Sequence, residues 1–174
     1  MITAITHQNM KDINKPHQPF NVIGKIIPEF IDGAWSYTEC LLDAPYEKNY
    51  PASELNCEDF INNPHQIIYF YYDENECVGQ IEITKNWNGY ALIQNIAVAK
   101  NSRKKGVGAQ LMNAAIEWAK ASGLSGLTLE TQDINVSACR FYNKIGFRIG
   151  GVDTMLYANL DTAHEKAIFW YMKF

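Results

Sequence analysis

The stretch that most constrains the fold of this chain covers residues 95–109. An apolar segment from Asn95 to Ala99 leads into a short basic loop with two glycines, and the pattern predicts a long amphipathic helix directly after it. Glycine lets the backbone approach a ligand without a Cβ in the way. The start of a helix offers unpaired N–H groups and the positive end of the helix dipole. This order of strand, loop and helix therefore indicates a binding site for phosphate.

The charges of the loop favour the same interpretation. Arg103, Lys104 and Lys105 place positive charge beside Gly106 and Gly108. Taken alone, a two-glycine loop is also typical of an ordinary tight turn between a strand and a helix. The loop lacks the Gly-Lys-Ser/Thr ending of an ATP-binding P-loop, so the sequence disfavours nucleotide hydrolysis.

The composition fits one ordinary domain. A length of 174 residues suits a single domain, and 47% apolar residues suffice for a full core. The formal net charge of −4 argues mildly against nucleic-acid binding and would suit a cationic small substrate, although many proteins carry a similar charge. We therefore expect one domain over residues 1–174, with residues 1–18 as a loosely held N-terminal arm.

The cysteines and the apolar runs indicate whether the chain binds a metal and in which cellular compartment it lies. The four cysteines form no C-x-x-C pair, and no histidine lies near two of them as a metal site would need. They are typical of reduced thiols in a cytosolic protein. Residues 1–14 have no apolar signal region, and no apolar run is long enough to span a bilayer. The sequence thus predicts a cytoplasmic protein without a metal site or a membrane partner.

The pattern outside the loop predicts a mixed α/β chain. Asp32-Gly33 lies between two strand-like runs and predicts a β-hairpin near the N-terminus. Side chains of different polarity alternate over 78–84, which predicts a strand over 76–84 with one buried face. We expect strands at 20–31, 35–42, 66–72, 76–84, 90–99, 126–131, 147–152, 155–158 and 167–173, and helices at 53–62, 106–122 and 135–145.

A second motif lies on the helix expected at 135–145. It reads Asn135-x-x-Ala138-x-x-Phe141-Tyr142-x-x-x-Gly146-Phe147. Ala138 and Tyr142 are four residues apart and share a helix face. A small residue followed one turn later by a phenol leaves a surface along which a slender ligand can lie. The plain alternative for the two aromatic side chains is core packing, above all for Phe141.

The two motifs together resemble the GCN5-related N-acetyltransferases, and their pairing is far more specific than either half. The resemblance implies an α/β fold in which a single mixed sheet, flanked by helices, is splayed open between its fourth and fifth strands, with the cosubstrate acetyl-CoA in the gap. It also implies that loop amides hold the pyrophosphate, that a strand edge pairs with the pantetheine arm, that Asn135 bonds the cofactor and that Tyr142 protonates the departing thiolate. The cofactor-binding residues implied are Ile96, Ala97, Val98, Arg103, Lys104, Lys105, Gly106, Val107, Gly108, Asn135, Ala138 and Tyr142.

Further stretches outside the two motifs are Pro19–Pro28, Lys85–Trp87, Leu129–Asp133, Val152–Asn159 and Phe169–Tyr171. These stretches look like the streptothricin acetyltransferases within that family. The resemblance then implies a small cationic amine substrate, the β-lysine moiety of streptothricin, and resistance by acetylation. The open alternatives are another amine (a polyamine, an aminoglycoside or a protein N-terminus) and, from a different class, a non-catalytic acyl-CoA-binding module.

Amine acetylation also needs a base and an oxyanion donor. We expect Glu82, in mid-strand, or Glu130, near the end of a strand, to act as the base through water. Gln94 stands where many relatives carry a carboxylate. By the resemblance, the N–H of Val98 is the oxyanion donor. The aromatic segment 169–171 is either core or the edge of a possible homodimer. Further candidates for a cationic pocket are Tyr37, Glu39, Tyr69, Tyr71, Asp153 and Tyr157.

Overall fold

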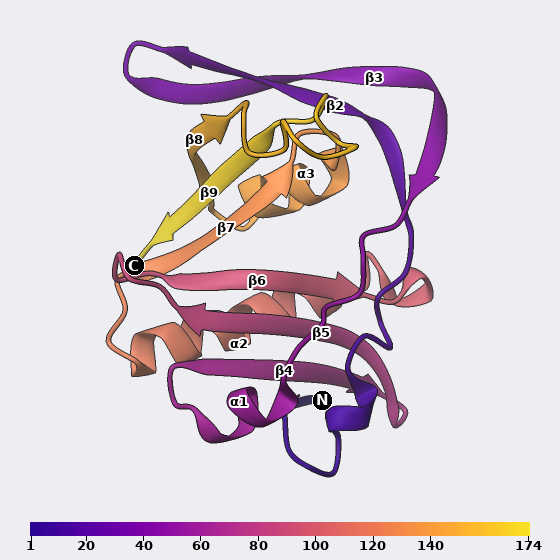
Figure 1. Cartoon of the computed structure of the whole chain (residues 1–174), viewed down its shortest axis with the longest axis vertical. Coiled ribbons are helices and arrows are strands. Elements are labelled where there is room, and N and C mark those ends of the chain that lie inside the picture. The colour runs from indigo at the N-terminus through magenta and orange to yellow at the C-terminus, as the bar shows by residue number, and fades with distance from the viewer. The chain divides into compact units, whose positions relative to one another are not determined.

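The computed structural model describes all 174 residues. The chain forms two compact units, and it passes between them more than once (Figure 1). The first unit comprises residues 1–19, 49–127 and 174, and the second comprises residues 20–48 and 128–173.

The first unit is built on an antiparallel sheet in the order β1-β4-β5-β6. The predicted meander of three strands is confirmed, with tight turns at Glu74-Asn75 and at Gly89, where φ is positive. The strands are β1 (Ile2–Ala4), β4 (Gln66–Asp73), β5 (Glu76–Lys85) and β6 (Ala91–Val98), and the helices are η1 (Met10–Asp12), α1 (Cys57–Asn62), η2 (Lys100–Ser102) and α2 (Val107–Ala121).

Helix α2 packs closely on β5 because that strand carries a glycine at the crossing. A Cβ built on Gly79 would lie 2.8 Å from Cγ1 of Val107 and 3.0 Å from Cδ1 of Leu111. The face of β5 toward the helix is apolar, and Ile81 and Ile83 are fully buried there. Since side chains alternate along a strand, Gln80 and Glu82 must lie on the opposite face of the sheet.

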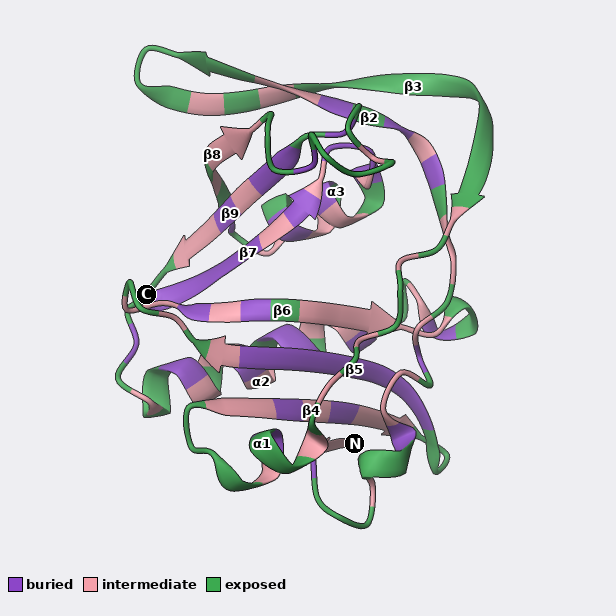
Figure 2. Ribbon diagram, viewed as in Figure 1, coloured by how far each residue is buried: buried purple, intermediate pink, exposed green.

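The second unit combines a two-stranded ribbon with a three-stranded sheet in the order β7-β9-β8. Trp170, Ile168 and Phe147 are among its fully buried side chains. Figure 2 shows that β3 is exposed over most of its length. The elements are β2 (Phe20–Ile31), β3 (Ala34–Lys48), β7 (Gly126–Gln132, which begins in the first unit), α3 (Val136–Lys144), β8 (Arg148–Asp153) and β9 (Ala167–Lys173).

The predicted hairpin is confirmed. Asp32 and Gly33 both have positive φ, as the turn requires, and β2 and β3 pair from Ile31↔Ala34 down to Phe20↔Lys48. The ribbon is tied to the rest of its unit by a backbone hydrogen bond of 2.9 Å from Ile26 N–H to the carbonyl of Asp133.

The prediction of a loosely held N-terminal arm is wrong. Residues 2–4 form strand β1, which pairs with β4, and Ile5 is only 5% exposed. Asp12 accepts a hydrogen bond of 2.6 Å from the hydroxyl of Tyr72 and another from Lys15. Strand pairing and a buried carboxylate, both formed with distant segments, hold the arm where local sequence gives no signal.

Two predicted elements also differ from the structure. The helix expected from Ser53 begins instead at Cys57, because the side chain of Asn56 caps it by accepting from Glu58 N–H at 3.3 Å. The strand expected at 155–158 is absent, because the carboxylate of Asp153 accepts from the N–H groups of Met155 and Leu156 and forms a turn.

The mixed α/β class with an N-terminal hairpin is confirmed. No helix combines the length and the apolar character that a membrane crossing requires. No group of three or more His, Cys, Asp or Glu side chains is arranged to hold a metal ion. All four cysteines are free, and burial raises the pKa of Cys77 to about 11 and that of Cys139 to about 12.

Candidate active site

The loop between β6 and α2 ends in a helix start that has no side-chain cap. Gly106 is the N-cap residue, with φ of +86°, a conformation that glycine adopts without strain. The first helical hydrogen bond runs from Gln110 N–H to the carbonyl of Gly106 at 3.1 Å. The N–H groups of residues 107–109 therefore precede the helical ladder, and they point from the helix start as donors for an anion.

The three basic side chains of the loop have different roles. Arg103 donates to three backbone carbonyls, those of Val98 at 2.9 Å and of Pro19 and Gln18 at 2.8 Å. Its guanidinium therefore fastens the end of β6 to the N-terminal segment, and direct phosphate binding by Arg103 stays a prediction. Lys104 and Lys105 are exposed and carry the positive charge of the loop into solvent.

Strand β6 contains a bulge that determines which of its residues lies opposite Glu82 on β5. Glu82 pairs with Asn95 and Ile83 with Ile93, so Gln94 is the extra residue. Bulges are common beside active sites, where they redirect side chains. Here the bulge places Asn95, and not Gln94, opposite Glu82. The predicted pantetheine strand, residues 96–98, continues β6 directly beyond this point.

Glu82 is a buried carboxylate, only 2% exposed. Its Oε1 accepts three hydrogen bonds, from Gln80 at 2.7 Å, from the hydroxyl of Ser53 at 2.9 Å and from Asn95 at 3.0 Å. All three donors are neutral. A carboxylate held in this way can receive a cation or a proton from a ligand.

In the second unit, Asn135 is the N-cap of α3. Its side-chain Oδ1 accepts from the N–H of Ala138 at 3.2 Å, which explains why the second motif spaces these residues by three. Ala138 is half-buried on the first turn of the helix. Asn135 is thus a structural cap, and its predicted bond to the cofactor stays a prediction.

Tyr142 is fixed by aromatic side chains. It is 6% exposed, and its ring centroid lies 5.5 Å from that of Phe141, 5.8 Å from Phe147 and 6.1 Å from Trp170. The core packing considered for Phe141 and Tyr142 is thus observed. A ring held on several sides places the phenol oxygen reproducibly, which general acid catalysis requires.

Glu130 lies on β7 and accepts a hydrogen bond from the hydroxyl of Tyr157. Burial raises the pKa of Glu130, the Tyr157 hydrogen bond opposes that rise, and the negative charge of Glu165 adds to it. Glu165 is 3% exposed and pairs with Lys48. A carboxylate with a raised pKa is a suitable proton acceptor near neutral pH.

The fold and these elements define a class of protein: the chain belongs to the acetyltransferase (GNAT) family, whose sequence profile matches residues 32–147. It is therefore an N-acetyltransferase. It is 55% identical, over the whole of both chains, to streptothricin acetyltransferase A of Bacillus subtilis. It is 37% identical to a streptothricin acetyltransferase of Escherichia coli, over 74% of this chain and 71% of that one.

Solved structures confirm the fold class. A protein of Bacillus anthracis designated a streptothricin acetyltransferase, in complex with acetyl coenzyme A, superposes with a TM-score of 0.92 at 37% identity, over 100% of this chain and 99% of that one. A nourseothricin acetyltransferase superposes with a TM-score of 0.83 at 24% identity, over 99% of this chain and 97% of that one. The second likeness concerns the fold alone.

Sequence reasoning missed the partners of Glu82. Gln80 could have been found, because residues two apart on a strand share a face. Asn95 could not, because its place opposite Glu82 depends on the bulge. Ser53 is distant from Glu82 in the chain, and its local pattern indicates only the start of a helix. The sequence suggests Tyr157 only as part of a cationic pocket, whereas the structure brings its hydroxyl to Glu130.

Gly108→Asp is expected to weaken acetyl-CoA binding by about 10- to 100-fold, because it adds a negative charge beside the predicted pyrophosphate position. The substitution should not harm the fold, since an acidic residue in the first helical turn stabilises a helix. Titration calorimetry with acetyl-CoA measures the effect, which should shrink at high salt. Gly108→Ala is the control for added bulk. Equal affinity of the Asp variant and the wild type would remove the phosphate site from this loop.

Glu130→Gln is expected to raise the melting temperature at pH 8 and to leave it unchanged below about pH 4, near the ordinary pKa of glutamate. The raised pKa means that Glu130 stabilises the fold while protonated and that this contribution is lost as pH rises through the folded-state pKa. Thermal melts across pH measure the difference. Glu117→Gln, on the exposed face of α2, is the control and should show no such trend. A lower melting temperature for Glu130→Gln at pH 8 would contradict the prediction.

Proposed function

We propose that this protein transfers the acetyl group of acetyl-CoA to an amine on the β-lysine arm of streptothricin, and so confers resistance in the cytoplasm, where acetyl-CoA is available. The observation that carries the proposal is the 55% identity to streptothricin acetyltransferase A over both full chains. The bound acetyl coenzyme A of the Bacillus anthracis relative, which aligns over the whole of this chain, supports the choice of acetyl donor.

The first unit would hold the phosphates and the thioester. The backbone amides of the loop 103–108 and of the α2 start bind the pyrophosphate, aided by Lys104 and Lys105. The edge of residues 96–98 pairs with the pantetheine arm. The N–H of Val98 donates to the oxygen of the tetrahedral intermediate, where negative charge develops.

The second unit would supply the acid. Asn135 and Ala138, at the start of α3, would bind the cofactor, and Tyr142 stands one turn after Ala138. The neutral amine attacks the thioester carbonyl carbon, the C–N bond forms and the C–S bond breaks. The phenol proton of Tyr142 passes to the departing thiolate, which leaves as CoA thiol, and the proton that the attacking nitrogen loses on forming the amide returns through water to the Tyr142 phenolate.

A carboxylate would take the proton that the substrate ammonium must lose before attack. Glu82 and Glu130 are the two candidates, and each is supported by a different observation. Glu82 is buried and bound only by neutral donors, which leaves its charge for a cation. Glu130 has a raised pKa, which suits proton transfer near neutral pH.

Association into a homodimer is part of the proposal for this protein's partners. The ribbon β2-β3 exposes Phe30, Ile31, Leu41 and Leu42, and such side chains are common at contacts between subunits. Sedimentation velocity at several protein concentrations tests this association.

The proposed reaction is tested by following CoA thiol release with a thiol reagent. Purified protein and acetyl-CoA are mixed in parallel with streptothricin, an aminoglycoside, spermidine and a short peptide. Rapid release with streptothricin alone is the expected result. Release with another amine would keep the acetyl transfer and replace the substrate. Binding of acetyl-CoA with no release for any amine would favour a non-catalytic acyl-CoA-binding module.

A further inference from the structure

We propose that Asn14 and Ser53 are positioning residues that hold Glu82 with one carboxylate oxygen presented to the substrate amine. The inference rests on the proposed acetylation of a cationic amine. It assigns a role in substrate binding to the N-terminal arm and to the segment before α1, neither of which carries a recognisable motif.

The carboxylate of Glu82 is held at one oxygen only. The donors from Ser53, Gln80 and Asn95 all reach Oε1, at 2.7–3.0 Å. Oε2 has no donor from the protein, and it is not among the polar atoms that are buried without a partner. The network therefore fixes the direction of the carboxylate and leaves its second oxygen able to accept from a ligand.

No cationic side chain pairs with Glu82. The ion pairs of the protein use other carboxylates, and the hydrogen-bond donors to Glu82 are a hydroxyl and two amides. Burying a carboxylate without a counter-charge is costly, and neutral donors offset only part of that cost. An ammonium group that reaches Oε2 would supply the missing charge, which is the recognition that a cationic amine needs.

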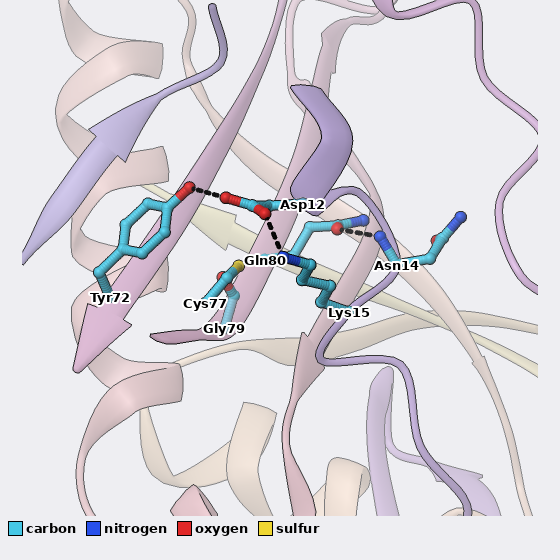
Figure 3. Close-up of polar contacts among 7 residues, drawn as sticks. All are labelled: Asp12, Asn14, Lys15, Tyr72, Cys77, Gly79 and Gln80. Atoms are coloured by element: carbon cyan, nitrogen blue, oxygen red, sulfur yellow. Dashed lines mark hydrogen bonds and ion pairs between the residues drawn. The ribbon is translucent and has the colours of Figure 1, made fainter. Parts of the chain in front are cut away.

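The orientation of the Gln80 amide is determined by the backbone of Asn14. The N–H of Asn14 can only donate, so the atom that it meets at 2.8 Å must be the Gln80 oxygen (Figure 3). The carboxylate of Glu82 can only accept, so the other end of the Gln80 amide must be the nitrogen. Asn14 and Glu82 thus require the same orientation of the Gln80 amide. Gln80 therefore links the backbone of the N-terminal arm to the carboxylate of Glu82.

The side chain of Asn14 places Ser53. Its Oδ1 accepts from Ser53 N–H at 3.3 Å and its Nδ2 donates to the Ser53 carbonyl at 2.9 Å. This pair of bonds fixes the backbone of Ser53, whose hydroxyl then donates to Glu82 and accepts from Asn95 at 3.1 Å. Asn14 has φ of +63°, a conformation that asparagine tolerates better than most residues.

The arm itself is anchored next to Asn14. Figure 3 shows Asp12 between the hydroxyl of Tyr72 and the ammonium of Lys15. Burial raises the pKa of Asp12, but the hydrogen bonds from Lys15 and Tyr72 outweigh it and hold that pKa below its ordinary value. Asp12 is thus ionised at neutral pH, and it keeps Asn14 in register with Gln80 on β5.

The test is a double-mutant cycle with Ser53→Ala and Glu82→Gln, read as steady-state kinetics with streptothricin and acetyl-CoA. Ser53→Ala removes one hydrogen bond to a charged group, so we expect kcat/KM for streptothricin to fall by about 10-fold or more. KM for acetyl-CoA should change by less than about twofold, and Ser53→Thr, which keeps the hydroxyl, should restore most of the loss. Ser125→Ala, on the surface of the same unit, is the matched control.

The decisive comparison is the effect of Ser53→Ala in the Glu82→Gln background. If Ser53 acts through Glu82, the serine substitution should have little further effect there. The same fold-loss in both backgrounds, or no loss in either, would overturn the inference. If Ser53→Ala proves unstable, Asn14→Gly takes its place in the cycle, because glycine retains the positive φ of residue 14. The same loss of kcat/KM is expected for it.

The proposed function is tested separately, by the turnover of streptothricin by the wild type. If the wild type does not acetylate streptothricin, the cycle uses whichever amine of the panel releases CoA. Failure of every amine would overturn both proposals.

Discussion

Tyr142→Phe is expected to lower kcat by about 100-fold or more while the affinity for acetyl-CoA changes little. The phenol is the proposed proton donor to the CoA thiolate, and phenylalanine removes only its oxygen. The ring should remain in place, because Phe141, Phe147 and Trp170 surround it and their contacts do not need the hydroxyl. Steady-state kinetics gives kcat, and calorimetry gives the affinity.

Tyr46→Phe is the matched control for this prediction. Tyr46 lies on β3 of the same unit and is 47% exposed, so removing its hydroxyl should leave kcat unchanged. An acetyl thioester of a thiol with a lower pKa than CoA sharpens the test. Such a thiol leaves readily as the thiolate, so its turnover should be less sensitive to Tyr142→Phe. An unchanged kcat in Tyr142→Phe would remove the acid role from this residue.

Glu82→Gln is expected to lower kcat/KM for the amine by about 100-fold or more, with KM for acetyl-CoA nearly unchanged. Glutamine keeps the size of the side chain and one oxygen, which can still accept from Ser53, Gln80 and Asn95. Its amide nitrogen replaces Oε2 and cannot accept from an ammonium group. The substitution therefore tests the free oxygen of the carboxylate without dismantling its surroundings.

The same kinetics in Glu130→Gln separates the two candidate bases. A large loss in Glu82→Gln with a small loss in Glu130→Gln would support Glu82 as the acceptor of the substrate proton. The reverse result would transfer that role to Glu130, and thermal melts of both variants would show whether either loss follows from unfolding.

Local patterns predicted most of the elements. The turn at Asp32-Gly33, the meander before the loop, and the helix that begins at about Asn135 all depend on interactions within a few residues, which the sequence displays directly. The predictions that failed concern residues whose partners lie far away in the chain. The helix predicted from residue 53 begins only at Cys57, because Ser53 hydrogen-bonds to a distant strand instead of capping a helix.

The sequence alone determined the class of this protein, because the loop 103–108 and the motif 135–147 combine backbone geometry and side-chain chemistry within short segments. Only the tertiary structure decided the position of Glu82 and its hydrogen-bond partners. Its position depends on a bulge in β6, on a pairing register and on two segments that lie far from it in the chain. Hydrogen bonds between distant segments leave no periodicity in the sequence, because each residue is chosen by a partner that the local chain does not contain.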